Sequence, residues 1–164
     1  MLIKPTASPP APQRPILGWR SFERVAAPPL PAFDELPHLA VSSGRAALYQ
    51  ALLLLKVGAG EAVLVPSYHC PTMVAAVLKT GAMPRFFPVG VDGLPALAGM
   101  PESVAGEVVR AIIVPHYFGR TQSLAAVRAW CDQRGVALIE DCAHSYFGMA
   151  GERAVGAWGD YAAA

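Results

Sequence analysis

The sequence feature that most limits the possible fold is the segment at residues 136–145. Its first four residues are apolar and follow a glycine, a pattern typical of a strand buried on both faces of a parallel sheet. Two carboxylates, a thiol and an imidazole follow within the next five residues. Open α/β sheets bind ligands at the carboxyl ends of their strands, so we expect Asp141 to point into a cleft. An aspartate that only caps nearby backbone amides would fit the same pattern.

Short apolar segments and helix-forming segments alternate along most of the chain. We expect strands at residues 62–65, 85–89 and 108–114, a fourth directly after Gly135, and helices at 46–56, 72–79 and 124–134. Glycines between residues 148 and 159 predict loops or a hairpin, and residues 160–164 could begin a further strand. The alternation predicts an α/β fold of three layers, with a mostly parallel sheet and helices on both faces.

Composition sets the broad class of the protein. The 164 residues are 54% hydrophobic and 15% charged, enough for one domain with a real core. A net charge of +1 gives no reason to expect nucleic acid or an anionic membrane as a partner. No apolar run approaches the ~18–20 residues of a membrane helix. Three widely spaced cysteines suit a reduced, cytoplasmic protein better than a disulfide framework.

The first part of the chain differs from the rest. Residues 1–38 are rich in proline and have no sustained periodicity, so we expect an irregular arm there and one folded unit over residues 39–164. The prolines near the start leave no apolar segment for a secretory signal.

Ser43, Gly44 and Arg45 form the first candidate binding element. Free amides at the start of a helix, with the helix dipole behind them, can bind an anion. Gly44 would let a phosphate approach the backbone closely, and Arg45 would add a positive charge. An ordinary capped helix with an exposed arginine would show the same residues.

Tyr68, His69 and Cys70 form the second candidate, because they follow an expected strand and should lie at the same sheet edge as Asp141. An aromatic or imidazole ring there can cover a flat cofactor, although a ring that packs into the core fits equally. Two other interpretations stay open: a zinc site and a Cys–His hydrolase with Cys70 or Cys142 as nucleophile. The zinc ligands would be His69, Cys70, Cys142 and His144, whose spacing is unlike that of zinc fingers.

Five motifs occur in a fixed order along residues 40–164. They are Ser43-Gly44-Arg45-Ala46-Ala47-Leu48, Val65-Pro66-Ser67-Tyr68-His69, Pro115-His116-Tyr117-Phe118-Gly119, Ile139-Glu140-Asp141-Cys142-Ala143-His144 and Gly156-Ala157-Trp158-Gly159-Asp160. The series resembles the DegT/StrS-type sugar aminotransferases, fold-type I enzymes that use pyridoxal 5′-phosphate (PLP). The proline-rich arm lies outside the resemblance.

The resemblance implies roles for particular residues. The amides of Gly44 and Arg45 would hold the phosphate of PLP, and Asp141 would keep its pyridine nitrogen protonated. His144 would bind the phenolic oxygen of PLP or lie beside the substrate. Tyr68, His69 and Cys70 would cover the ring. The position of Arg45 is often threonine in the family, and the ring-stacking residue, usually aromatic, aligns with Cys70.

The family's Schiff-base lysine follows the segment at Gly159 and Asp160 within roughly ten residues. Here Ala164 is the last residue, and Lys4, Lys56 and Lys79 do not occupy that motif. We therefore expect the N-terminal part of a large domain that lacks the catalytic lysine and is inactive alone. In this fold the first strand, residues 63–65, is expected at a sheet edge.

The resemblance also implies the reaction and the partners. A donor such as glutamate or glutamine would pass its amino group through PLP to a keto-sugar or related carbonyl, in a homodimer. The alternative is a non-catalytic PLP-binding or interaction remnant of the same fold.

Overall fold

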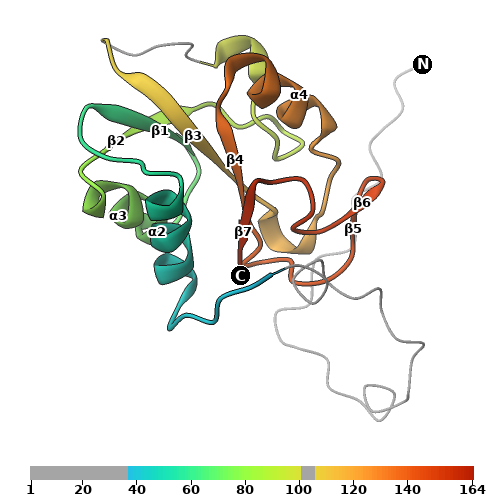
Figure 1. Ribbon diagram of the computed structural model, residues 1–164. Coiled ribbons are helices and arrows are strands. Elements are labelled where there is room, and N and C mark those ends of the chain that lie inside the picture. Colours follow the sequence, from blue (N-terminus) through green and yellow to red (C-terminus); the bar gives the residue numbers. More distant parts are fainter. Residues whose placement is uncertain (1–36, 101–105) are drawn as a thin grey trace, which may run out of the picture.

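The computed structural model describes residues 37–100 and 106–164 (Figure 1). Nearly all of the expected arm at residues 1–38 lies outside the described residues. The helices are α2 (Gly44–Leu54), α3 (Pro71–Lys79) and α4 (Ala125–Arg134), with 3₁₀ turns η2 (Leu97–Gly99) and η3 (Tyr117–Gly119). The strands are β1 (Glu61–Pro66), β2 (Met83–Phe87), β3 (Val108–Pro115), β4 (Ala137–Asp141), β5 (Met149–Ala150), β6 (Arg153–Ala154) and β7 (Tyr161–Ala163).

Five strands form one sheet in the order β2-β1-β3-β4-β7, and every neighbouring pair is parallel. The predicted fold class is confirmed. Strands β5 and β6 form a separate antiparallel hairpin, in the glycine-rich region where loops or a hairpin were expected.

The expected position of the first strand is wrong. β1 lies inside the sheet, paired with β2 on one side and β3 on the other. Residues Val63, Leu64 and Val65 are completely buried, whereas β2 exposes Met83 and Phe86. The more exposed strand therefore forms the edge, where one side of the backbone is open to solvent.

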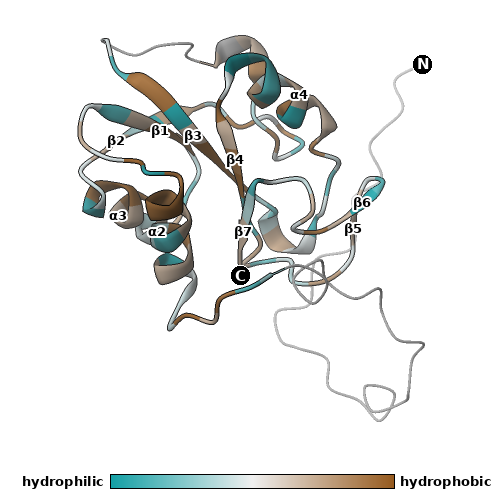
Figure 2. Ribbon diagram, viewed as in Figure 1, coloured by the Kyte–Doolittle hydropathy of each residue, from teal (hydrophilic) through white to brown (hydrophobic). Residues whose placement is uncertain are grey.

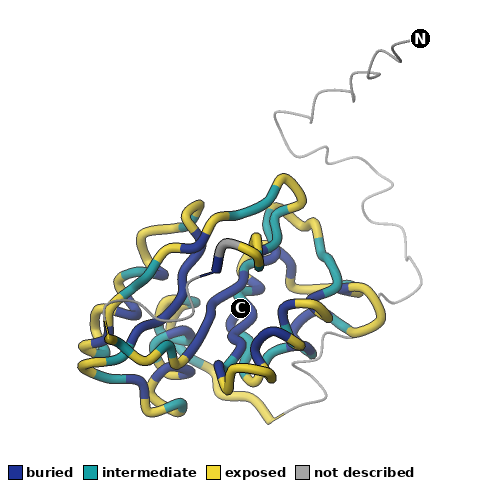
Figure 3. The backbone as a smooth tube through the Cα atoms, turned by 90° about the horizontal axis from the view of Figure 1, so that it is seen from above, coloured by how far each residue is buried: buried dark blue, intermediate teal, exposed yellow. Residues whose placement is uncertain are grey.

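Side chains of the central strands alternate between two cores. Figure 2 shows that much of the ribbon of β3 and β4 is hydrophobic. Val63, Val65, Ile113 and Ile139 pack against α2 and α3, which cover one face. Leu64, Ile112, Val114 and Leu138 pack against α4 on the other face. Figure 3 shows the buried strands between the more exposed outer segments.

The helix ends follow the expected local signals. Ser43 caps α2, since its Oγ accepts from the Ala46 amide at 3.2 Å. Pro71 begins α3, a position where its missing N–H costs nothing. Gly135 ends α4 in the left-handed conformation, with φ of 64°. Within the two described ranges, no helix is both long and apolar enough to cross a membrane.

Candidate functional site

A pocket of about 340 Å³ opens at the carboxyl edge of the sheet, between the start of α2 and the ends of β3 and β4. We call it the Asp141 pocket. Six of the seven predicted site residues line it: Gly44, Arg45, His69, Cys70, Asp141 and His144. The seventh, Tyr68, lines a neighbouring pocket of about 330 Å³. The fold therefore brings together residues as far apart in the sequence as Gly44 and His144.

One end of the Asp141 pocket can bind an anion. Ser43 accepts hydrogen bonds from the amides of Ala46 and Ala47, at 3.2 and 2.9 Å. The amides of Gly44 and Arg45 donate to no described residue, so they remain available to a ligand. A Cβ added to Gly44 would meet nothing within 4 Å, which leaves space beside these amides.

The other end holds a half-buried carboxylate. Asp141 Oδ1 accepts from the Ala143 amide at 3.1 Å, while Oδ2 accepts from no described residue. Burial raises the pKa of Asp141, and the Ala143 amide, His144 and His116 lower it in part. The capping role considered from the sequence is present, but it occupies only one carboxylate oxygen.

His144 is exposed at the mouth of the pocket. Its ring stacks on Phe118 with a centroid distance of 5.5 Å, and its Nδ1 lies 3.5 Å from the Phe118 amide. The contact with the amide is long for a hydrogen bond, so the ring stack is the firmer of the two. Phe118 was not singled out as a site residue by the sequence analysis.

The three side chains of the 68–70 turn lie in different surroundings. His69 is turned towards the sheet: Nδ1 lies 2.8 Å from the Pro66 carbonyl oxygen, and the ring stacks on Phe86 at 5.0 Å. Cys70 is exposed beside the Asp141 pocket, and its sulfur accepts from the Thr72 hydroxyl at 3.1 Å. Hydrogen bonds from Thr72 lower the pKa of the Cys70 thiol. Tyr68 turns to the neighbouring pocket.

A buried network under the pocket was not recognised from the sequence. Glu140 is completely buried, and both of its oxygens are saturated. Oε1 accepts from the amides of Trp158 and Gly159, at 2.6 and 2.7 Å. Oε2 accepts from the Gly156 amide at 3.1 Å and lies 2.9 Å from His116 Nε2. No described lysine or arginine pairs with this carboxylate.

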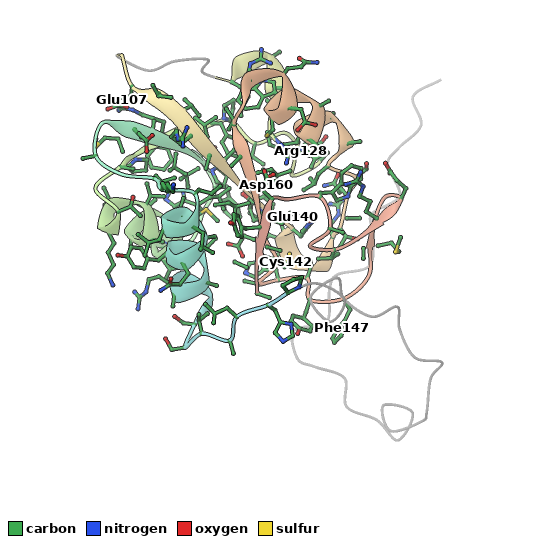
Figure 4. All side chains as sticks on the ribbon, in the orientation of Figure 1. Glu107, Arg128, Glu140, Cys142, Phe147 and Asp160 are labelled. Atoms are coloured by element: carbon green, nitrogen blue, oxygen red, sulfur yellow. The ribbon has the colours of Figure 1, made fainter. Side chains whose placement is uncertain are left out.

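One signal could have revealed this network. Successive side chains of a strand point to opposite faces, so Glu140 and Asp141 cannot share one pocket. A glutamate inside an apolar strand must then be buried and needs donors. The glycines at 156 and 159 supply two of them because bare backbone can approach closely. Figure 4 shows Glu140 and Cys142 in the interior, with Glu107 at the far end of the sheet.

The zinc site considered from the sequence shares only Cys142 with the cluster of possible ligands that the structure gathers. Among residues 37–100 and 106–164, ligand atoms of His116, Glu140 and Cys142 lie within 4.8 Å of one another. The Glu140 oxygens already accept four hydrogen bonds. Burial raises the pKa of the Cys142 thiol, which disfavours the thiolate that binds metals. The network is satisfied by protein groups.

Comparisons with known proteins agree on one family. Residues 22–164 match the model of the DegT/DnrJ/EryC1/StrS aminotransferase family. An L-glutamine:2-deoxy-scyllo-inosose aminotransferase of Streptomyces paromomycinus is 33% identical over 133 residues, which are 80% of this chain and 31% of the relative. A GDP-perosamine synthase of Vibrio cholerae is 28% identical over 120 residues, 73% of this chain and 33% of the relative.

A solved structure shows the same fold. The aminotransferase TlmJ of Streptoalloteichus hindustanus superposes with a TM-score of 0.64 at 31% identity, over 74% of this chain and 33% of its own. The chain therefore spans about a third of the length of the relatives it matches.

Proposed function

Because the chain belongs to the DegT/DnrJ/EryC1/StrS aminotransferase family, we propose that its Asp141 pocket binds PLP and that the whole protein transfers an amino group to a keto-sugar-like acceptor. One observation carries the proposal. The pocket has unpaired backbone amides at one end and a half-buried carboxylate at the other. PLP carries a phosphate on a side arm and a nitrogen in its ring, so the two ends of the pocket suit its two polar groups.

At the phosphate end of the pocket, most of the proposed binding groups are backbone amides. The amides of Gly44 and Arg45, with the dipole of α2, would bind the phosphate, and the Arg45 guanidinium would add charge. Gly44 is suited to this position because its missing side chain leaves the space that the phosphate would fill.

The carboxylate end would hold the pyridine nitrogen. Asp141 Oδ2 is available as an acceptor, and an ionised Asp141 would keep a proton on the ring nitrogen. When bound, PLP supplies an electron sink for the amino-transfer chemistry. The chain's own groups bind and orient it, with His69 and Cys70 along one wall and His144 at the mouth.

No described lysine is placed to attach PLP covalently in the Asp141 pocket. Lys56 follows the C-terminal end of α2, and Lys79 is the last residue of α3, where it lies over the Tyr49 ring. The N-terminal ends of the same two helices line the pocket. Neither lysine lines the pocket, so the proposed cofactor contacts within the described chain are non-covalent.

The proposals for the amino donor, the oligomeric state and the location in the cell rest on membership of the family. We include in the proposal an amino donor such as glutamate or glutamine, a homodimer and a cytoplasmic location. The name of one relative includes L-glutamine, which supports an amino acid donor. The three cysteines are free, as in a reducing compartment.

A binding experiment tests the proposal. The purified protein is titrated with PLP and with pyridoxal, which has the same ring but no phosphate. We expect PLP to bind at least about tenfold more tightly, because charge-assisted hydrogen bonds hold the phosphate. Equal affinities would contradict the assignment of the phosphate end.

A second assay separates the two functions considered. The whole protein is incubated with PLP, glutamine or glutamate and a panel of keto-sugars, and the amino product is measured. Amino transfer supports the enzyme. PLP binding without transfer to any acceptor would favour the non-catalytic alternative.

A further inference from the structure

His116 connects the buried Glu140 network to the Asp141 pocket. It follows β3 directly, and its backbone amide donates to the carbonyl oxygen of Asp141 at 3.1 Å. Its ring nitrogen Nε2 lies 2.9 Å from Glu140 Oε2. The residue is only 3% exposed, yet it is one of those that line the pocket. One side chain therefore contacts both the buried carboxylate and the space beside Asp141.

The contact with Glu140 indicates which ring nitrogen of His116 carries a proton. Three backbone amides already donate to the two Glu140 oxygens, at 2.6, 2.7 and 3.1 Å. Because these oxygens act as acceptors, we assign a proton to Nε2, which then donates to Oε2. The backbone of His116 is held as well, since its carbonyl oxygen accepts from the Ser145 hydroxyl at 3.2 Å. His116 is therefore fixed by its backbone and by Nε2.

The other ring nitrogen of His116, Nδ1, has no hydrogen-bond partner within residues 37–100 and 106–164. Every fully buried side-chain nitrogen or oxygen in these ranges does have a partner. Nδ1 must therefore reach open space, and the Asp141 pocket is the space that His116 lines. An unpartnered polar atom on a nearly buried residue needs an explanation, and a role in the pocket supplies one.

The charged and titratable side chains around Asp141 come from several elements. They are Arg45, His69, Cys70, His116, Tyr117, Glu140, Cys142 and His144. Burial raises the pKa of Asp141, and a hydrogen bond from the Ala143 amide lowers it in part. The imidazoles of His144 and His116 also lower this pKa. His144 is exposed, so solvent and salt screen its charge more strongly than that of the buried His116.

We propose that His116 is a positioning residue for Asp141. Glu140 holds Nε2, Nδ1 opens to the pocket, and the imidazole keeps the Asp141 carboxylate ionised and in place for the N–H of a ring bound there. The buried network then acts on the site as well as on the stability of the fold. The identity of the ring as the pyridine of PLP rests on the proposed function.

Two amide side chains separate the roles of the two ring nitrogens. His116→Gln places an amide nitrogen near the position of Nε2, so it keeps a donor for Glu140 and loses Nδ1. His116→Asn places an amide nitrogen near the position of Nδ1 and leaves Glu140 without this donor. We expect the melting temperature to fall further in His116→Asn, because a buried carboxylate then lacks one hydrogen bond. The opposite order would contradict the assignment of Nε2 to Glu140.

Ligand binding to the purified protein tests the action on Asp141. The probes are PLP, 1-deaza-PLP, in which a C–H group replaces the ring nitrogen, and pyridoxal, which lacks the phosphate. We expect the wild type to prefer PLP to 1-deaza-PLP about tenfold, and His116→Gln to reduce this preference to about twofold. The preference for PLP over pyridoxal should stay the same. A purely structural role of His116 would leave both preferences unchanged or weaken them together, and either result would overturn the proposal.

A measurement without PLP keeps this inference separate from the proposed function. Asp141→Asn removes the charge that His116 is proposed to stabilise. We expect this substitution to raise the melting temperature at pH 7 more in a His116→Gln background than in the wild type, because the ionised carboxylate has lost its imidazole there. A His144→Gln background is the control, and the gain should stay close to that in the wild type because solvent screens this exposed imidazole.

The outcomes of the melting comparison are distinct from those of the binding experiment. Equal gains in the wild-type and His116→Gln backgrounds, or a larger gain with His144→Gln, would overturn the proposal. If PLP binds no form of the protein while the gains differ as expected, the proposed function falls and the action of His116 on Asp141 stands. Equal affinities of the wild type for PLP and 1-deaza-PLP would overturn the contact between Asp141 and the ring nitrogen.

Discussion

At one end of the Asp141 pocket the proposed binding groups are backbone amides at the start of α2, and at the other end the proposed binding group is a side chain at the end of β4. Gly44 and Arg45 lie at the surface, and the space around Gly44 is open. Asp141 lies above Glu140, a carboxylate with four hydrogen bonds that link β4 to His116 and to the loop before β7.

The difference predicts two kinds of mutational response. A site made of backbone amides keeps its geometry when nearby side chains change, because the helix itself positions the donors. A site that depends on a buried carboxylate network loses both stability and binding when one member is removed. We therefore expect large losses of stability when a member of the Glu140 network is removed, and effects confined to binding at the α2 end.

Removal of the Glu140 carboxylate should have the largest effect. Glu140→Met leaves two buried backbone amides, one partly buried amide and His116 without their acceptor, so we expect the free energy of unfolding to fall by about 3–5 kcal/mol. Denaturant unfolding measures this change. Glu107→Met is the control, since it removes a partly exposed ion pair with Arg85, worth about 0–1 kcal/mol. Similar losses in the two variants would contradict the special role of the buried network.

Asp141→Asn should separate binding from stability. We expect PLP affinity to fall about 10- to 100-fold, because the charge-assisted hydrogen bond to the pyridine nitrogen is lost. Equilibrium dialysis measures the affinity. Asp132→Asn, the same change on the exposed face of α4, should leave affinity unchanged.

The same Asp141→Asn variant should be more stable than the wild type without PLP. Burial raises the pKa of Asp141, so ionisation is less favourable in the folded chain than in the unfolded chain. The stability contributed by the neutral form is present below the ordinary pKa of 3.8 and is lost as the pH rises through the raised value. The advantage of asparagine should therefore appear at neutral pH and shrink towards pH 3.8. A constant difference across this range would argue against burial as its cause.

Blocking the phosphate space tests the α2 end. Gly44→Leu fills the open space beside the free amides, so we expect PLP affinity to fall about tenfold with little change in melting temperature. Gly58→Leu is the matched control: its Cβ also meets nothing within 4 Å, and it lies beyond the other end of α2. A large loss of stability in Gly44→Leu would break the comparison between the two ends.

The smallest effect should be that on the reactivity of Cys70, which lies in the wall of the Asp141 pocket between its two ends. Hydrogen bonds from Thr72 lower the pKa of exposed Cys70, whereas burial raises the pKa of Cys131 to about 12 and also raises that of Cys142. We expect iodoacetamide to modify Cys70 first, and Thr72→Val to slow the reaction by a few fold at pH 7. Mass spectrometry identifies the modified residue. PLP should protect Cys70, and equal rates with and without PLP would place Cys70 outside the binding site.

Local signals predicted most of the elements. The glycine after α4 and the serine before α2 mark boundaries that depend only on neighbouring residues, and both lie where expected. The polar residues after the β1 and β4 segments were predicted to meet because the carboxyl ends of parallel strands share one edge. Four of the six predicted residues that line the Asp141 pocket lie there for this reason: His69, Cys70, Asp141 and His144. The other two, Gly44 and Arg45, lie at the start of α2.

The sequence by itself determined which residues form helices and strands, and which polar groups reach the edge of the sheet, because periodicity and capping act over a few residues. Tertiary structure alone decided that β1 lies inside the sheet, that Glu140 is buried under the pocket, and that Tyr68 turns away from His69 and Cys70. Strand order depends on pairing between distant segments, and the donors of Glu140 come from residues 16 to 24 positions away. Contacts of that separation form only when the whole sheet is assembled, so no local pattern contains them.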